Sequence, residues 1–282
     1  MLNGVLIYTE YEANRNRFFI DELLDAAKKS SINLKLVIFE KTVFDFTDND
    51  IDIFYDNNHI KEVDFAILRM MNYTLALNFE KCGVRVFNNS FVSKITDNKY
   101  LTYQEMKKND VPVLNTVFQY DVNVSDVFYP NVTKPIDSKG GDRVFLNKDF
   151  NDLNKSISCY KECNYILQEV ADDVGKDLRV YVIGDKIVTS ILRTAREGII
   201  SNYCKGGVPS KYNLEAAQKE LVKKIIDVLK PDYVGIDFLF CKEGIVLNEI
   251  ENVVGARMVY ELTDINIARE FVNYVKEQMD KK

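Results

Sequence analysis

Hydrophobic positions in residues 1–90 alternate between a strand-like pattern and a helical pattern. Continuous apolar runs predict strands at residues 5–10, 34–40, 65–70 and 84–88. Between the first two runs, apolar residues recur at helical spacing at Phe19, Leu23, Ala26 and Ala27. Strands that alternate with helices indicate a parallel, doubly wound sheet. We therefore predict an α/β N-terminal domain that spans residues 1–96.

The pattern changes after this domain, because the predicted strands now pair with their neighbours along the chain. Two of them flank a turn at Gly184-Asp185. Helices are predicted at 99–109, 149–158, 214–228 and 264–279. Antiparallel strands with helices to one side predict two α+β lobes. We place these lobes at residues 97–170 and 171–282.

A predicted β-hairpin at residues 233–252 places three carboxylates on one face. Two β-rich runs flank Lys242-Glu243-Gly244, and glycine can adopt the positive φ that such a turn requires. With the turn centred on its glutamate, Asp237 lies opposite Glu249, and alternation along the strand adds Glu251 to the same face. Like charges that face each other destabilise a sheet by roughly 0.2–1 kcal/mol. A hard cation such as Mg²⁺, which prefers carboxylate oxygens, would reverse this effect.

The alternative interpretation of this hairpin is a solvated acidic face. Its opposite face is filled by Ile236, Phe238 and Phe240. The same register places Leu239 and Leu247 on the acidic face itself. Two leucines among the carboxylates argue against a fully solvated surface.

Composition and charge narrow the classes of protein to consider. The chain of 282 residues is 46% hydrophobic and 28% charged, as is typical of a globular protein. Its net charge of −6 argues against a broad nucleic-acid-binding face. No apolar run is long enough to cross a bilayer, and the N-terminus has no signal-peptide pattern. We expect a cytoplasmic protein that binds neither nucleic acid nor membrane.

Cysteine and histidine offer little chemistry in this chain. The five cysteines are scattered, and the pair Cys159 and Cys163 has no second pair to complete a zinc set. We therefore expect free thiols in the core. His59 is the only histidine and lies in a polar stretch, which argues against a triad that depends on histidine. Acid–base steps would then use Asp, Glu, Lys, Tyr or the substrates.

A glycine-containing loop follows a predicted strand that delivers Lys134. Pro135 prevents a helix there, and Ser138-Lys139-Gly140-Gly141 forms a loop with free backbone N–H groups. Such loops bind phosphate oxygens, and nearby lysines add positive charge. The alternative is a plain hairpin turn, because a Gly-Gly pair alone is common in turns. The chain has no P-loop motif.

The order of features along the chain is more specific than any one of them. The features are Asp97 to Thr102, Lys134-Pro135 with its glycine loop, Gln168-Glu169-Val170, Asp177 to Val180, Arg193 to Ala195, Ser201-Asn202 with Gly206-Gly207, Gly235-Ile236-Asp237, and Asn248 to Asn252. In this order the chain resembles the ATP-grasp superfamily and, within it, the ribosomal-protein glutamate ligases (RimK-type). The resemblance covers nearly the whole chain, and it includes the segment ILRMMNYTLALNFEKCGVRVFNNS of the first domain.

The resemblance implies a nucleotide site for ATP. Lys99 and Lys134 match the lysines that contact the phosphates, and Asp177 matches a residue that contacts the ribose. The remaining residues that it implies for the nucleotide are the loop residues Ser138, Gly140 and Gly141, the adenine hinge Gln168, Glu169 and Val170, Arg179, and Ser201 with Asn202. The family usually has arginine where this chain has Ile200, so Arg193 or Arg179 would take over that phosphate contact.

The resemblance also implies a metal site and catalytic residues. Asp237, Glu249 and Glu251 match the Mg²⁺ ligands, with two Mg²⁺ ions expected and Mn²⁺ as a substitute. The third ligand is usually asparagine, so Glu251 adds negative charge to the site. Lys99, Arg193 and Arg257 are the expected catalytic residues, with Arg257 facing the acyl phosphate.

A RimK-type ATP-grasp fold implies an ATP-dependent carboxylate–amine ligase with an acyl-phosphate intermediate. Two other hypotheses are a nucleotide-binding regulatory protein without turnover and a phosphotransferase that stops at phosphorylation. The expected partners are an amino acid or peptide, a protein C-terminus among them, and further copies of the chain in a dimer or tetramer.

Arg69, in the predicted strand 65–70, allows two interpretations. It forms either an ion pair at a domain interface or a clamp for a substrate carboxylate.

Overall fold

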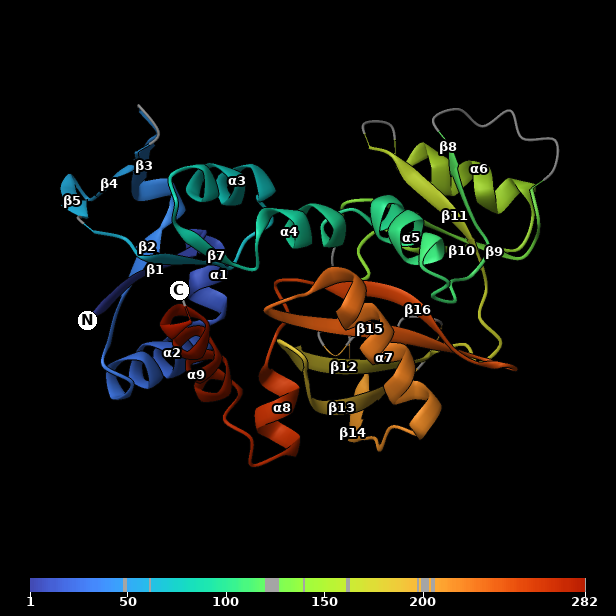
Figure 1. Ribbon diagram of the computed structural model, residues 1–282. Helices are drawn as coiled ribbons and strands as arrows, with labels where there is room; N and C mark the ends of the chain where they lie inside the picture. Colours follow the sequence, from blue (N-terminus) through green and yellow to red (C-terminus); the bar gives the residue numbers. More distant parts are fainter. Residues whose placement is uncertain are drawn as a thin grey trace.

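The computed structural model confirms the parallel sheet of the N-terminal domain (Figure 1). The structure describes residues 1–47, 50–60, 62–119, 127–138, 140–160, 163–196, 198, 203 and 206–281. The parallel strands, in the spatial order β2-β1-β6-β7, are β1 (Leu2–Tyr8), β2 (Ile32–Ile38), β6 (Phe65–Leu68) and β7 (Arg85–Phe87). The helices of this part are α1 (Glu10–Arg15), α2 (Arg17–Lys29), α3 (Tyr73–Lys81) and α4 (Ser90–Thr96).

A small antiparallel sheet that the sequence pattern did not predict is inserted between β2 and β6. It contains a 3₁₀ turn and three strands, namely η1 (Phe39–Lys41), β3 (Thr42–Asp45), β4 (Asp52–Tyr55) and β5 (Asn58–Ile60). His59 lies in β5, where its Nε2 is 2.7 Å from Asp52 Oδ1. The only histidine is therefore engaged in a surface pair.

The second sheet is antiparallel and has the order β10-β9-β11-β8. Its strands are β8 (Thr116–Gln119), β9 (Asn131–Pro135), β10 (Phe145–Asn147) and β11 (Tyr165–Glu169). The helices of this part of the chain are α5 (Lys99–Lys108) and α6 (Phe150–Ser158). Asn98 begins α5 as its N-cap, because its side chain accepts a hydrogen bond from Leu101 N. This cap fixes Lys99 as the first residue of the helix.

The third sheet is also antiparallel and has the order β14-β13-β12-β15-β16. Its strands are β12 (Lys176–Ile183), β13 (Lys186–Thr194), β14 (Val208–Lys211), β15 (Tyr233–Cys241) and β16 (Gly244–Glu251). The helices that follow or connect them are α7 (Ala216–Leu229), α8 (Arg257–Leu262) and α9 (Ile267–Asp280). The two α+β lobes of the predicted fold class are thus present, and the boundaries at 96/97 and 170/171 stay a prediction.

Two hydrophobic layers cover the third sheet. On one face, Val222, Ile226 and Leu229 of α7 pack with Ile236 and Phe238 of β15. The core on the other face extends from Tyr181 and Tyr233 into the N-terminal domain. Alternation along each strand therefore gives the sheet two buried faces.

The C-terminal helix α9 packs beside α2 of the N-terminal domain, as Figure 1 shows for the red and blue ends of the chain. Phe271, Val272 and Val275 of α9 belong to the same buried cluster as Phe19 and Leu23 of α2. The last helix therefore joins the first domain to the third sheet.

Buried polar side chains also connect the N-terminal domain to the third sheet. Asn88 Oδ1 accepts hydrogen bonds from the backbone N–H groups of Asp232 (2.6 Å) and Tyr233 (3.0 Å), and its Nδ2 donates to Tyr233 O (2.7 Å). Arg85 Nη2 pairs with Asp232 Oδ1 at 2.6 Å. These bonds orient β7 against the start of β15.

The expectation of cysteines in the core is wrong. Cys159 is exposed, and Cys82, Cys163 and Cys241 are only half-buried, although all four are free thiols. Cys204 lies outside the described residues. The cysteines are in turns and strand ends rather than on core faces, which their scattered spacing did not reveal.

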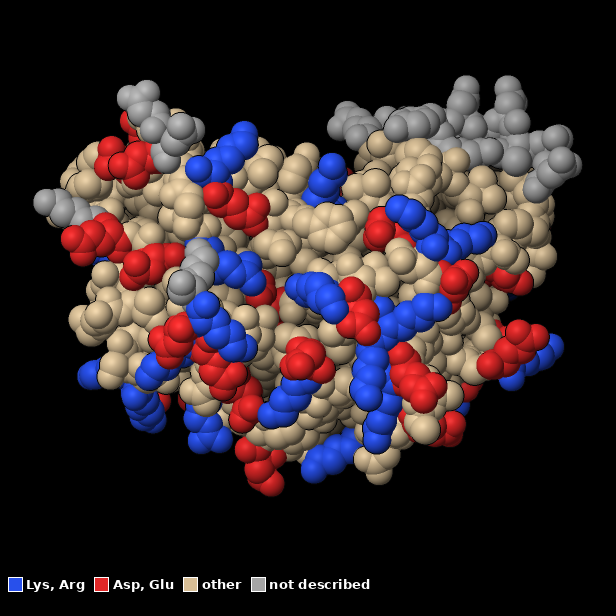
Figure 2. Space-filling view, in the orientation of Figure 1, with Lys and Arg blue, Asp and Glu red and all other residues tan. Residues whose placement is uncertain are grey.

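Charged side chains of both signs are interspersed over the face seen in Figure 2. Lys and Arg alternate there with Asp and Glu instead of gathering by sign. Among the described residues, no helix combines the length and the apolar character needed to cross a membrane.

Candidate active site

The predicted hairpin forms β15 and β16, and Asp237 pairs with Glu249 as expected. The register of the residues between this pair and the turn differs from the prediction. Cys241 pairs with Gly244, so the turn contains two residues, and a β-bulge then restores the expected pairing. Asn248 is the extra residue in the bulge, between the pairs Phe238–Leu247 and Asp237–Glu249.

The bulge overturns the expectation that Leu247 lies on the acidic face. Leu247 is opposite Phe238 and fully buried in the same hydrophobic cluster, so it belongs to the apolar face. An extra residue in one strand reverses the alternation of side chains beyond it. The prediction assumed a regular ladder from a turn centred on one residue, so it did not include this reversal. Leu239 does lie on the acidic face, where it lines a cleft.

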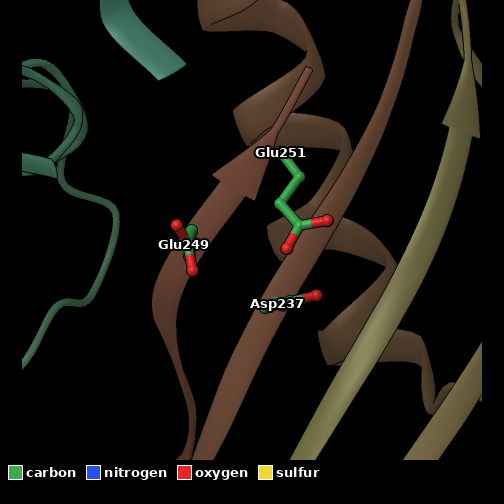
Figure 3. Close-up of side chains that lie close together, drawn as sticks. All are labelled: Asp237, Glu249 and Glu251. Carbon is green, nitrogen blue, oxygen red and sulfur yellow. The ribbon is translucent and has the colours of Figure 1, made fainter. Parts of the chain in front are cut away.

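The three predicted metal ligands come together in the structure (Figure 3). One carboxylate oxygen of each of Asp237, Glu249 and Glu251 lies within 4.8 Å of the others. Asp237 is 2% exposed, and the two glutamates of β16 are partly buried. Without compensation, three carboxylates this close would repel one another in a site of low dielectric constant.

Two arginines compensate the charge of these carboxylates. Arg179 of β12 binds Asp237 through two parallel bonds of 2.7 Å, and its Nη2 is also 2.7 Å from Glu251 Oε1. Arg193 of β13 binds Asp177 through two bonds of 2.5 Å and donates to Asp237 Oδ2 at 2.6 Å. All four strands that carry these residues are neighbours in one sheet, which explains why the ion pairs form.

The arginines determine the protonation of Asp237. Burial raises the pKa of this carboxyl, but Arg179 and Arg193 outweigh burial and lower the pKa to about 2. Asp237 is therefore ionised at neutral pH, as a metal ligand must be.

Two lysines approach the carboxylates from the second sheet and α5. Lys99 Nζ is 3.0 Å from Glu249 Oε1 and donates to Ser138 O. Lys134 Nζ donates to Asn248 Oδ1 at 2.9 Å, so the residue of the bulge positions this lysine. Burial lowers the pKa of Lys134 to about 8, although Glu249 opposes the shift.

A cleft of about 860 Å³ lies between the second and third sheets and is called the nucleotide cleft below. Its lining includes most of the residues predicted for ATP and metal, namely Lys99, Lys134, Ser138, Gly141, Gln168, Glu169, Val170, Asp177, Asp237 and Glu249. Apolar walls come from Val132, Val144, Val174 and Leu239. A cleft lined by both apolar side chains and lysines suits a purine with a polyphosphate chain.

The hinge residues are held by β8 and the segment before it. Glu169 N donates to Asn115 O, and Glu169 Oε2 accepts from Asn115 Nδ2 at 3.0 Å. Gln168 is buried and donates to Thr116 Oγ1 at 2.9 Å. Ser201 and Asn202, also predicted for the nucleotide, lie outside the described residues.

A second cleft of about 520 Å³ lies next to the first and is called the arginine cleft below. It is lined by Arg15, Arg179, Arg193, Arg257, Glu251 and Tyr203, with Gly140 also at its wall. The predicted residues Gly140, Arg193 and Arg257 thus face this cleft. Arg15 comes from α1 and was not predicted, because nothing in its local sequence distinguishes it from other surface arginines.

Arg69 lies at a domain interface, as one interpretation expected, but it forms hydrogen bonds there and no ion pair with a described residue. The clamp for a substrate carboxylate stays a prediction. Arg69 is 5% exposed and donates to Val254 O at 2.6 Å and to Tyr8 Oη at 3.3 Å. Its guanidinium also lies over the rings of Phe19 and Tyr233. It therefore anchors the loop after β16 to the N-terminal domain without a carboxylate partner among the described residues.

The carboxylates fit a hard cation. Each ionised carboxylate has about four lone-pair directions, and the arginines use three of those on Asp237. Glu249 and Glu251 each have one ion-pair contact, with Lys99 and Arg179 respectively. Oxygen ligands from all three residues therefore remain for Mg²⁺, which also takes water and phosphate oxygens as ligands.

The chain is similar in sequence to known ligases. It is 27% identical over 243 residues to the glutamate–LysW ligase ArgX of Sulfurisphaera tokodaii, which covers 80% of this chain and 86% of the relative. It is 22% identical over 279 residues to a probable alpha-L-glutamate ligase of Maridesulfovibrio salexigens, covering 93% of each.

Solved structures share the fold. The D-alanine–D-alanine ligase of Bacillus anthracis complexed with ATP matches with a TM-score of 0.75 at 15% identity, over all of this chain and 98% of that one. A RimK domain ATP-grasp protein of Sphaerobacter thermophilus matches with a TM-score of 0.73 at 16% identity, over 96% and 99%. These matches confirm the predicted fold class.

A sequence model of the RimK-like ATP-grasp domain matches residues 96–275, from the end of α4 to the last helix. This match, the relatives and the structural neighbours agree with the resemblance in sequence. The chain belongs to the RimK-like ATP-grasp family and is an ATP-dependent carboxylate–amine ligase.

Proposed function

We propose that this ligase uses glutamate, or another acidic amino acid, as the amine that it joins to a carboxylate of an amino acid, a peptide or a protein C-terminus. The names of the relatives support glutamate. The observation that carries the proposal is the meeting of the nucleotide cleft and the arginine cleft at one cluster of carboxylates. Nucleotide and amino acid would approach the same point from two clefts.

The reaction balances in two steps. The carboxylate of the acid substrate attacks the γ-phosphorus of ATP, the bond to the β–γ bridging oxygen breaks, and ADP leaves an acyl phosphate. The amine then attacks the acyl carbon and loses a proton, while the bond between that carbon and the phosphate oxygen breaks. The products are an amide, ADP and phosphate. The departing phosphate can take the proton of the amine, so no histidine is needed.

We assign the roles of the residues on this basis. Lys99 and Lys134 would contact the phosphates with the loop of Ser138 and Gly141, while Glu169 and Val170 would read the adenine. Further contacts to the nucleotide are proposed for Gln168, Asp177, Arg179, Ser201 and Asn202. Arg193 would stabilise the transferring group, and Arg257 would bind a substrate carboxylate beside it, with Gly140 at the same wall.

ATP-grasp ligases use ATP with Mg²⁺. We propose that Asp237, Glu249 and Glu251 hold two Mg²⁺ ions, and that Mn²⁺ can substitute. When bound, the metal neutralises charge that develops on the phosphates. We also propose a cytoplasmic homo-oligomer, a dimer or tetramer, which light scattering of the purified protein would test.

The test of the function is a matrix of acids and amines, with ADP and amide measured together. We expect ADP release that requires both an acid and glutamate, with amide in equal amount. ADP formed with an acid alone and no amide would indicate a phosphotransferase. Nucleotide binding without ADP release from any pair would indicate a regulatory protein.

A further inference from the structure

The arginine cleft is separated from the nucleotide cleft by a single layer of ion pairs. Asp177 and Asp237 line the nucleotide cleft, and their partners Arg193 and Arg179 line the arginine cleft. Glu251, one of the three clustered carboxylates, also lines the arginine cleft. A molecule in this cleft would therefore lie next to the point where a phosphoryl group is transferred.

Two of the four arginines in this cleft are already engaged. Arg179 and Arg193 are buried, and each binds an aspartate through two parallel bonds. Their charge compensates the carboxylates of the sheet. The charges of the remaining pair, Arg15 and Arg257, therefore determine which ligand the cleft binds.

Arg257 is available for a ligand. It is exposed at the start of α8, and no carboxylate of the described residues lies within 4.0 Å of its guanidinium. Glu261 of the same helix accepts a hydrogen bond of 2.6 Å from Tyr203 Oη. The guanidinium lies over the Tyr203 ring, 5.8 Å from its centroid, and this ring orients it.

Arg15 reaches the same cleft from the N-terminal domain. It is the last residue of α1, and its side chain is 47% exposed. Its carboxylate partner is Glu12 at 3.4 Å on the same helix, a long and exposed pair that contributes little. A ligand carboxylate can therefore replace Glu12 at low cost.

We infer that Arg15 and Arg257 form a clamp for the non-reacting carboxylates of the amine substrate and so select glutamate over its amide. The inference rests on the proposed function. A glutamate that reacts through its amine keeps two free carboxylates, which match two arginines from two domains. An acid substrate with a single carboxylate uses that group in the reaction. The planar guanidinium fork binds such carboxylates through two bonds.

The experiment measures binding of L-glutamate and of L-glutamine to the full chain saturated with Mg²⁺ and a non-hydrolysable ATP analogue. We expect the unmodified protein to bind glutamate more tightly than glutamine. Arg15→Gln and Arg257→Gln should each weaken glutamate binding about tenfold, as for loss of a charge-assisted hydrogen bond. The variant that loses the arginine of the side-chain carboxylate should leave glutamine binding unchanged. The other variant should weaken glutamine binding as well, because both ligands carry the α-carboxylate. The glutamate-to-glutamine ratio is the readout that a purely structural role would not change.

Arg17→Gln is the matched control. Arg17 is two residues from Arg15, has a side chain 72% exposed, and pairs with Asp21 at 3.4 Å outside the cleft. Its replacement should leave both affinities unchanged. Equal binding of glutamate and glutamine by the unmodified protein, or an unchanged ratio in both cleft variants, would overturn the clamp. Analogue binding is measured in the same samples, and its absence would instead count against the proposed function.

Discussion

Lys134 carries its charge in a buried position, where water does not stabilise it. Burial lowers its pKa to about 8 in the ligand-free protein. Above this pH the free protein holds Lys134 neutral, and ATP would bind only with uptake of a proton. We expect affinity for a non-hydrolysable ATP analogue to fall by up to tenfold per pH unit above pH 8.

Titration calorimetry between pH 6.5 and 9.5 would measure this dependence. Lys134→Arg is the control, because arginine stays charged over the whole range. Its analogue affinity should lack the fall above pH 8. A fall of the same size in both proteins would assign the titration to another group.

Glu249 is the best residue with which to test the metal site separately from the fold. Asp237 holds two buried arginines, so its replacement would also disturb the sheet, whereas Lys99 is the one ion-pair partner of Glu249 in the part of the chain that the structure describes. Glu249→Gln keeps the size of the side chain and removes its charge. We expect apparent Mg²⁺ affinity, measured in the presence of the ATP analogue, to fall by roughly tenfold to a hundredfold.

Glu243→Gln, in the exposed turn of the same hairpin, removes one charge outside the cluster. It should leave Mg²⁺ affinity unchanged. The same loss in both variants would mean that net charge, and not ligation, determines the affinity.

At the scale of elements, strand β15 and the loop after β16 approach each other at Gly235. A Cβ atom at Gly235 would lie 2.5 Å from Val254 Cγ2 and 3.5 Å from Arg179 Nε. Val254 is fully buried and its carbonyl accepts from Arg69, so the loop has little freedom to move. Gly235→Ala should lower the free energy of unfolding by roughly 1–3 kcal/mol through overpacking.

Urea denaturation measures this change, and two further variants interpret it. Gly255→Ala is the control, since nothing lies within 4 Å of a Cβ atom there. The double variant Gly235→Ala with Val254→Ala removes the clashing methyl groups. Failure of the double variant to recover any of the stability lost in Gly235→Ala would contradict a steric cause.

At the scale of the whole molecule, Asn88 connects the N-terminal domain to the third sheet. Its amide satisfies the backbone N–H groups of Asp232 and Tyr233 and one carbonyl, all buried. Asn88→Ala removes the side-chain partner of these groups. Each buried polar group without a hydrogen bond lowers the free energy of unfolding by roughly 1–3 kcal/mol. We expect a loss of at least about 2 kcal/mol in the free energy of unfolding.

Thermal and urea unfolding would measure the loss. Asn33→Ala is the control, because Asn33 is exposed and, among the described residues, its side chain bonds to Asn3 alone. The N-terminal domain and α9 share a core, so both unfolding probes should report one transition. A separate early transition in the variant would show that the domains unfold independently.

The sequence by itself determined most of the elements, their order and most of the chemical groups, but not the small sheet of β3, β4 and β5. Local periodicity specifies strands and helices, and the hairpin pattern predicted that Asp237 faces Glu249, although not the register between that pair and the turn. These properties depend on residues close together in the chain. The motif order also indicated the family, which the match to the RimK-like ATP-grasp domain confirms.

Only the tertiary structure decided the bulge at Asn248, the partners of Arg69 and the arrival of Arg15 beside Arg257. The bulge moved Leu247 to the apolar face, where burial of its side chain outweighs a regular ladder. Arg69 and Val254 are 185 residues apart, and their contact depends on how the domains pack. Periodicity carries no information at that range, because packing of complementary surfaces between domains, rather than local backbone preference, determines such contacts.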